Sequence, residues 1–147
     1  MYSFRTSIGP VDLAFTDRVG GVSAAPFDTL NLGYAGADDP AAVEQNLRLV
    51  LDDFAPGATL ADMAQVHGAD VVLVGGARDR AGGERPECDA VVTTHPDVVL
   101  MARSADCVPV LLADVDAGVI GAVHSGRPGL LAGVAPAAVR AMQDLGA

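Results

Sequence analysis

Residues 105–126 read ADCVPVLLADVDAGVIGAVHSG, two apolar segments on either side of a short polar stretch. The first segment covers residues 108–114 and the second covers residues 118–124. Both have the length and composition of β-strands, and the polar residues 114–117 have the composition of a turn. The stretch therefore predicts a β-hairpin, with Cys107 and His124 at its open end.

The hairpin brings one of the two cysteines close to one of the three histidines. If residues 114–117 form a four-residue loop, counting back along both strands sets Cys107 directly opposite His124. Pro109 has no N–H, so it fits opposite Ala122 only where its nitrogen points away from the partner strand. Pro109–Ala122 would then be a non-hydrogen-bonded pair, and so would Cys107–His124. Directly opposed Cβ atoms in antiparallel strands lie about 4.5–5.5 Å apart. This spacing suits a shared metal ion or a thiolate–imidazole pair, and simple packing of a buried cysteine is the plain alternative.

A second histidine provides a third candidate ligand. The segment AQVHGAD (residues 64–70) places His67 at a predicted strand end, followed by Gly68, where another backbone segment can approach closely. Two imidazoles and one thiolate leave a fourth position open, which is typical of catalytic rather than structural zinc. The ligand spacing matches no local zinc-finger pattern, so the residues alone leave a purely structural role open.

Composition restricts the class of protein. The chain has 147 residues, half of them hydrophobic, which fits a single domain with a hydrophobic core. Its formal net charge is -10 and it contains no lysine, so it offers no basic block to nucleic acid or an anionic membrane. No secretory leader or membrane-spanning run is visible, and two cysteines are too few for a disulfide framework. We therefore expect a cytoplasmic protein that binds neither nucleic acid nor membranes, and the oligomeric state stays open.

The rest of the chain alternates between short strands and helices. A helix is predicted after Asp39, a candidate N-cap, with Pro40 in its first turn and an end at Pro56–Gly57. The tail, residues 129–147, has a helical pattern with a break or restart at Pro136. Further strands are predicted at residues 11–16, 69–75, 89–94 and 98–103, a long loop at 17–33, and a polar connection at 77–87. This order predicts an α+β domain, a layered mixed β-sheet sandwich with flanking helices.

Several segments resemble signatures of the laccase-domain family, also called multicopper polyphenol oxidase or peptidoglycan editing factor. They read FTDRVGGVSAAPFDTLNLG, DDPAAVEQN, QVHGADVV, CDAVVTTHPDVVLMARSADCVPVLLAD and AVHSGRPGL. The resemblance implies the laccase-domain fold, which is similar to that of cytotoxic necrotizing factor. It also implies a zinc ion bound by His67, Cys107 and His124, and it assigns the catalytic role to the same three residues.

The sequence departs from the family pattern in three respects. The family usually has Arg after the Asn of the predicted helix, whereas here Asn46 is followed by Leu47 and then Arg48. The family's last motif commonly reads His-Ala-Gly-Trp-Arg-Gly, whereas residues 124–129 read HSGRPG. Family chains also continue through further strands and helices, so residues 1–147 are expected to form the N-terminal portion of a longer laccase-like domain. We therefore expect this chain alone to be less active than a full-length relative.

The resemblance implies a purine nucleoside phosphorylase that also has adenosine deaminase activity. Adenosine, inosine or guanosine and phosphate would be the substrates, and the free base and ribose 1-phosphate the products. Candidate substrate-binding residues are Arg18, Asn31, Ser125 and Arg127. Residues 125–127 lead into a predicted helix, where free backbone N–H groups suit a phosphate. The alternative to substrate binding for Arg18, on its glycine-rich loop, is a solvated side chain. The alternative for Asn31 is an Asx-turn with its own loop backbone.

Three other functions stay open on the sequence alone. Cys107 activated by His124 would be the nucleophile of a hydrolase. Copper in place of zinc would suit a phenol oxidase, although one ligand set cannot make a multicopper cluster. A metal-binding domain without catalysis is the third alternative.

Overall fold

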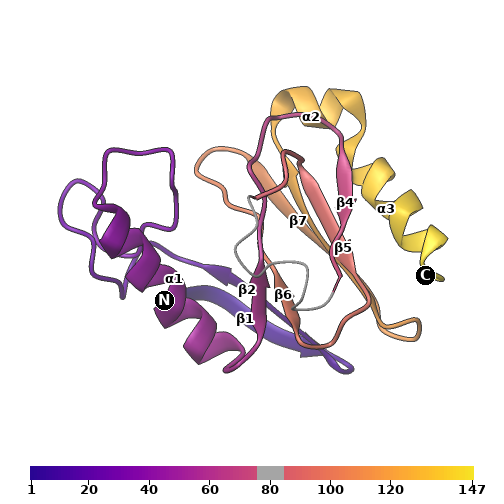
Figure 1. Cartoon of the computed structure of the whole chain (residues 1–147), viewed down its shortest axis with the longest axis horizontal. Coiled ribbons are helices and arrows are strands. Elements are labelled where there is room, and N and C mark those ends of the chain that lie inside the picture. The colour runs from indigo at the N-terminus through magenta and orange to yellow at the C-terminus, as the bar shows by residue number, and fades with distance from the viewer. Residues whose placement is uncertain (76–84) are drawn as a thin grey trace. The chain divides into compact units, whose positions relative to one another are not determined.

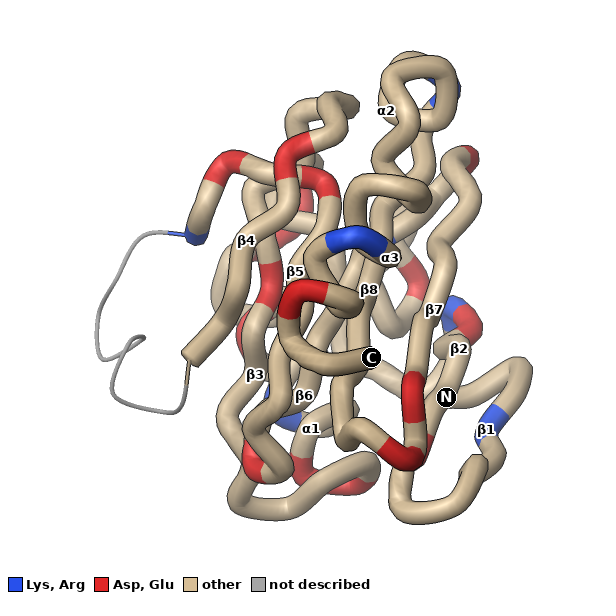
Figure 2. The backbone as a smooth tube through the Cα atoms, turned by 90° about the vertical axis from the view of Figure 1, so that its right-hand side faces the viewer, with Lys and Arg blue, Asp and Glu red and all other residues tan. Residues whose placement is uncertain are grey.

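The computed structural model describes residues 1–75 and 85–147. Its contacts divide the chain into two compact units, Met1–Gly57 and Ala58–Ala147 (Figure 1). Of the predicted polar connection at 77–87, residues 77–84 lie outside the described residues. Figure 2 shows acidic residues spread along strands, turns and helices with far fewer basic ones among them. In the described residues, no helix is both long enough and apolar enough to span a membrane.

The first unit contains an antiparallel hairpin and one helix. Strand β1 (Tyr2–Ile8) pairs with β2 (Val11–Thr16), which has the predicted bounds. Strand β1 was not predicted, although Tyr2, Phe4 and Ile8 alternate with polar residues, and most of its side chains are exposed. The strand is held to the helix by Arg5, whose guanidinium lies 5.2 Å from the Tyr2 ring centre and 5.3 Å from that of Phe54. Arg5 also pairs with Asp53 at 2.8 Å.

Helix α1 (Pro40–Phe54) begins and ends as predicted. The Asp39 side chain accepts a hydrogen bond from the Ala41 N–H at 2.9 Å, and Val43, Leu47 and Val50 are buried. The helix also buries Asn46 completely. The Asn46 amide group donates to the Ser23 hydroxyl and to the backbone carbonyls of Thr29 and Asn31, and its oxygen accepts from the Val22 N–H. Asn46 thus anchors the predicted long loop to the helix.

The second unit is built on a four-stranded mixed sheet in the order β4-β5-β8-β7. Strand β4 runs parallel to β5, whereas β8 is antiparallel to both β5 and β7. A separate parallel pair joins β3 and β6. The strands are β3 (Thr59–Ala61), β4 (Val71–Leu73), β5 (Ala90–Thr93), β6 (Val98–Leu100), β7 (Val108–Asp114) and β8 (Val119–Ser125). The structure confirms every predicted strand in this unit, and β3 is an addition.

Alternating residues of β5 pack on opposite faces of the sheet. Ala90 and Val92 face helix α3 (Val134–Asp144), which covers one side of the sheet (Figure 1). Val91 packs on the other side with Ala61 of β3 and Val98 of β6. Because both faces are covered, all four residues of β5 are buried. The result is the predicted α+β arrangement of layers, with the β3–β6 pair, the mixed sheet and the helix stacked in turn.

The predicted hairpin exists, but its register was predicted wrongly. Asp114 pairs with Val119 and Pro109 with His124, so each residue of β7 pairs two positions further along the chain than expected. The turn explains the difference, because Gly118 has a φ of 67° and lies in the loop. The Asp114 carboxylate accepts from the N–H groups of Asp116 and Ala117 and caps the last strand position. Cys107 therefore precedes β7 and is not the cross-strand partner of His124.

The C-terminal tail forms two helices, α2 (Arg127–Ala132) and α3. The break lies at Gly133, whose φ of 85° is a left-handed conformation that favours glycine. This break was predicted at Pro136, and that prediction was wrong. Pro136 lies in the first turn of α3, where a missing backbone N–H costs no helical hydrogen bond.

Candidate metal centre

Three side chains from separate segments of the second unit converge. The candidate ligand atoms of His67, Cys107 and His124 all lie within 4.8 Å of one another. The Cys107 sulfur is 3.7 Å from His67 Nε2, and the two imidazole rings meet edge to face with their centres 4.8 Å apart. Tetrahedral zinc with ordinary Zn–N and Zn–S bonds would separate a nitrogen and a sulfur ligand by about 3.6 Å. The donor types and the distance between the Cys107 sulfur and His67 Nε2 therefore suit a single bound metal ion.

The three candidate ligands differ in exposure. His124 lies in β8 and is 2% exposed, Cys107 is half-buried at the entrance of β7, and His67 is exposed. His67 has a φ of 62°, the one left-handed non-glycine residue in the described part of the chain. One side of the cluster therefore faces the protein interior and the other faces solvent, which leaves an approach for a further ligand.

A fourth residue, Asp89, connects the two histidines. It is fully buried directly before β5, and its Oδ1 lies 2.7 Å from His124 Nδ1. The same carboxylate accepts the backbone N–H groups of Val66, His67 and Gly68. Burial alone would raise the pKa of Asp89, but the hydrogen bonds from His124 and from these backbone groups outweigh it and lower the pKa.

Asp89 was not among the site residues predicted from the sequence. A signal was present, because an aspartate directly before a strand of four buried residues needs a partner inside the protein. The sequence could not say which partner, since Asp89 is 35 residues from His124 and 21 to 23 residues from its three backbone donors.

Glycine at position 126 leaves room for the cluster. A Cβ atom at Gly126 would lie 2.5 Å from Cδ2 of His67 and 3.2 Å from the Cys107 sulfur. At Gly129, one turn into α2, a Cβ atom would lie 2.6 Å from the Gly68 carbonyl oxygen. The chain after β8 therefore runs against the turn that carries His67, and only glycine allows this approach.

A side-chain amide joins the segments that carry His67 and Cys107. The Gln65 amide group donates to the Arg103 carbonyl at 2.9 Å, and the Arg103 N–H donates to the Gln65 oxygen at 2.7 Å. The Arg103 guanidinium in turn pairs with Asp62, which is buried. These contacts hold the chain four residues before Cys107 against the chain two residues before His67.

Of the candidate substrate-binding residues, two lie beside the cluster in sequence and two belong to the first unit. Ser125 is buried at the end of β8, and Arg127 is exposed at the start of α2. Arg18 is largely exposed, and its Nε donates to the Asp28 carbonyl. Asn31 donates to Asp38 and accepts from the Gly33 N–H, which is the Asx-turn of the alternative interpretation.

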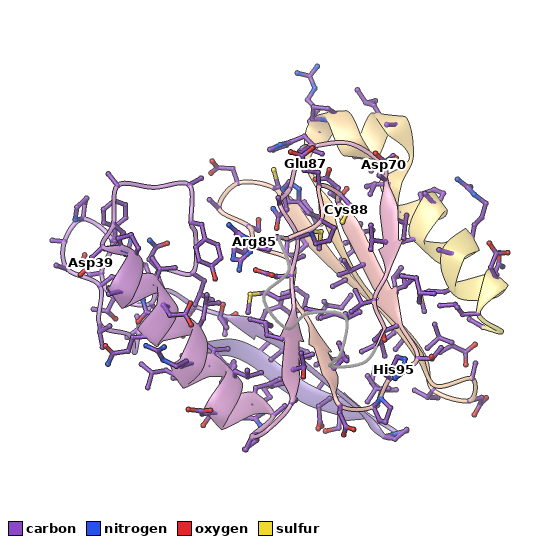
Figure 3. The ribbon with its side chains drawn as sticks, in the orientation of Figure 1. Asp39, Asp70, Arg85, Glu87, Cys88 and His95 are labelled. Atoms are coloured by element: carbon purple, nitrogen blue, oxygen red, sulfur yellow. The ribbon has the colours of Figure 1, made fainter. Side chains whose placement is uncertain are left out.

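The remaining cysteine and histidine lie apart from the cluster. Cys88 and His95 are at opposite ends of β5 (Figure 3). Cys88 is completely buried, and burial raises the pKa of its thiol to about 11. His95 is exposed. Within residues 1–75 and 85–147, His67, Cys107 and His124 form the one group of three or more potential metal ligands.

Comparison with known proteins relates this architecture to named relatives. The purine nucleoside phosphorylase of Streptomyces coelicolor is 51% identical over 150 residues, covering 100% of this chain and 60% of the relative. That of Streptomyces griseus is 54% identical over 144 residues, covering 95% of this chain and 56% of the relative. The crystal structure of the Neisseria meningitidis protein NMB0706 matches with a TM-score of 0.82 and 32% identity, covering 95% of this chain and 57% of that one.

The chain therefore spans less than two thirds of the length of these relatives. A family model described as "Multi-copper polyphenol oxidoreductase laccase" matches residues 12–147. This match covers the second compact unit, all of the first unit except residues 1–11, and all three candidate ligands. The chain belongs to this laccase family, as its sequence motifs suggested.

Proposed function

We propose that this chain provides the zinc site of a purine nucleoside phosphorylase. The observation that carries the proposal is the convergence of His67, Cys107 and His124 within 4.8 Å, in a chain about half identical to proteins named purine nucleoside phosphorylase. The proposed substrates are phosphate and adenosine, inosine or guanosine, and the products are the free base and ribose 1-phosphate. Adenosine deamination is proposed as a second activity of the same site.

The donor set supports zinc as the metal. One thiolate and two neutral imidazoles would leave a zinc site with a net charge of about +1, a local attraction for phosphate in a chain whose formal net charge is -10. Bound zinc would supply a Lewis acid that polarises an oxygen nucleophile. Copper also accepts two imidazoles and a thiolate, so the donor set alone does not separate the two metals.

The chain's own residues would then hold and orient the substrates. The exposed side of His67 gives access to the cluster, and Arg127 places a cation two residues after the strand that carries His124. We propose that Arg127 and Ser125 contact phosphate. In phosphorolysis, a phosphate oxygen forms a bond to C1′ of ribose while the bond from C1′ to the base breaks, and the departing base takes up a proton.

A hydrolase with Cys107 as nucleophile is the second candidate function. The 3.7 Å distance between the Cys107 sulfur and His67 Nε2 favours a thiol–imidazole pair, although the histidine differs from the one the sequence suggested. Alkylation separates the two functions. A thiolate bound to zinc is protected until a chelator is added, whereas a free nucleophile reacts at once.

The test follows release of free base from adenosine and inosine by chromatography, with and without phosphate. It compares this chain, its Cys107→Ala variant and the Streptomyces coelicolor relative, with Cys88→Ala as a matched thiol variant outside the cluster. Base release that needs phosphate and is lost only in Cys107→Ala supports the proposal. Inosine formed from adenosine without phosphate would show deamination, and oxidation of phenols by a copper-loaded chain would favour the oxidase.

A further inference from the structure

Both carboxylate oxygens of Asp89 are hydrogen-bonded, and every one of these side-chain bonds leads to a candidate metal ligand or to its immediate neighbours. Oδ1 lies 2.7 Å from His124 Nδ1 and accepts the His67 N–H at 2.9 Å. Oδ2 accepts the Gly68 N–H at 2.6 Å and the Val66 N–H at 3.2 Å. The residue is fully buried, so no water competes for either oxygen. The backbone of His124 also donates to the Asp89 carbonyl at 2.8 Å.

We propose that Asp89 is a positioning residue that sets both histidines for one metal ion. It does so by fixing which nitrogen of His124 carries the proton and by holding the turn that presents His67. The inference rests on the proposed zinc site and adds to it a residue that would not touch the metal.

The tautomer of His124 follows from the other partners of the carboxylate. Three backbone N–H groups can only donate, so both oxygens of Asp89 are acceptors, and these donors favour the ionised carboxylate over the neutral acid. An ionised carboxylate also accepts from His124, which places the imidazole proton on Nδ1. In a neutral ring the other nitrogen, Nε2, then keeps its lone pair, and a lone pair is what a metal requires.

The turn carrying His67 depends on the same carboxylate. A φ of 62° is a conformation that side chains larger than glycine rarely adopt. Three consecutive N–H groups converge on Asp89 only because the backbone at residues 66–68 curls around it. Without the carboxylate, these three N–H groups would lose their acceptor, and the left-handed conformation of His67 would lose the hydrogen bonds that stabilise it.

Asparagine at position 89 gives a specific expectation, because an amide group cannot accept on both sides. If the NH₂ replaces Oδ2, it faces the N–H groups of Val66 and Gly68, which cannot change. If it replaces Oδ1, it faces one backbone N–H and His124, whose ring can move its proton to Nε2 and accept. The second arrangement has fewer opposed donors, so Asp89→Asn should switch His124 to the Nε2–H tautomer and remove the lone pair at that atom.

The experiment reads the tautomer directly by ¹⁵N NMR of the histidine side chains in the metal-free chain, at alkaline pH where imidazoles are neutral. Zinc affinity is measured separately by competition with a chromophoric chelator. The variants are Asp89→Asn and, as a matched control, Asp116→Asn in the exposed turn at the opposite end of the β7–β8 hairpin. We expect Nδ1–H in the wild type and in the control, Nε2–H in Asp89→Asn, and zinc binding about 10–100-fold weaker in that variant alone.

Two results would overturn the inference. One is an Nε2–H tautomer of His124 in the wild type. This measurement needs no variant, so it tests the inference even if Asp89→Asn does not fold. The other is a folded Asp89→Asn chain with the wild-type tautomer and wild-type zinc affinity. Failure of the wild type to bind zinc, with Nδ1–H present, would instead refute the proposed function and the metal-positioning role that rests on it.

Discussion

Replacing Gly126 with alanine should separate metal binding from folding. Gly126 has a φ of -71° and a ψ of 161°, an extended conformation that alanine adopts freely. The backbone therefore has no reason to change. The added methyl group, however, would lie 2.5 Å from the His67 ring, and the ring has to move.

The size of the effect follows from the contact distance. Carbon atoms in contact prefer a separation of about 3.5–4.0 Å, so the ring must shift by about 1 Å or more. Metal–ligand distances tolerate about 0.2 Å. We expect zinc affinity to fall by about 100-fold, or about 2.7 kcal/mol. Because His67 is exposed, the ring can move toward solvent, and the cost to folding should stay near 1 kcal/mol, a shift in Tm of about 2–4 °C.

Isothermal titration with zinc and a thermal melt of the metal-free chain measure the two effects separately. Gly36→Ala is the matched control, since its new Cβ atom would approach no neighbour closer than 3.4 Å. If Gly126→Ala binds zinc as tightly as the wild type, the argument that glycine makes room for His67 as a ligand is refuted.

Three further predictions concern the rest of the chain. Iodoacetamide should label half-buried Cys107 in the native metal-free chain and buried Cys88 only after unfolding, because burial raises the pKa of the Cys88 thiol to about 11, and peptide mass spectrometry distinguishes the two sites. Asn46→Ala should lower the free energy of unfolding by about 2–4 kcal/mol in urea titrations, more than Asn31→Ala, since a completely buried network loses its centre. Burial and the neighbouring Asp53 raise the pKa of Tyr2 to about 12, so the folded state keeps this proton when the unfolded state releases it. Stability should therefore fall between pH 10 and 12, and less steeply in Tyr2→Phe.

The elements that could be predicted are those whose own residues decide them. Helix α1 has its N-cap at Asp39, its proline at Pro40 and an apolar face of helical spacing, and its bounds were confirmed. The strands β7 and β8 are long apolar runs and were also found. Their pairing register was predicted wrongly, because it depends on the hydrogen bonds of Asp114 in the turn and on the conformation of Gly118. Amino-acid composition determines neither of these.

The candidate site shows the same division. His67, Cys107 and His124 could be named because imidazole and thiol groups are few in this chain and because the motifs around them resemble a family pattern. Asp89 could not be assigned to them, since one aspartate among many shows no preference for a distant partner until the fold brings it to His124. The role of Gly126 could not be predicted either, because it depends on its contact with His67, which lies far away in the sequence.

Zinc content per chain is the most direct measurement of whether His67, Cys107 and His124 bind a metal together. The wild type and Cys88→Ala, purified from the same medium, should each contain about one zinc per chain and little copper. Cys107→Ala should lose most of its zinc while keeping its fold by circular dichroism, since the half-buried thiol contributes little to the core. Equal zinc in the wild type and in Cys107→Ala would contradict the proposed site.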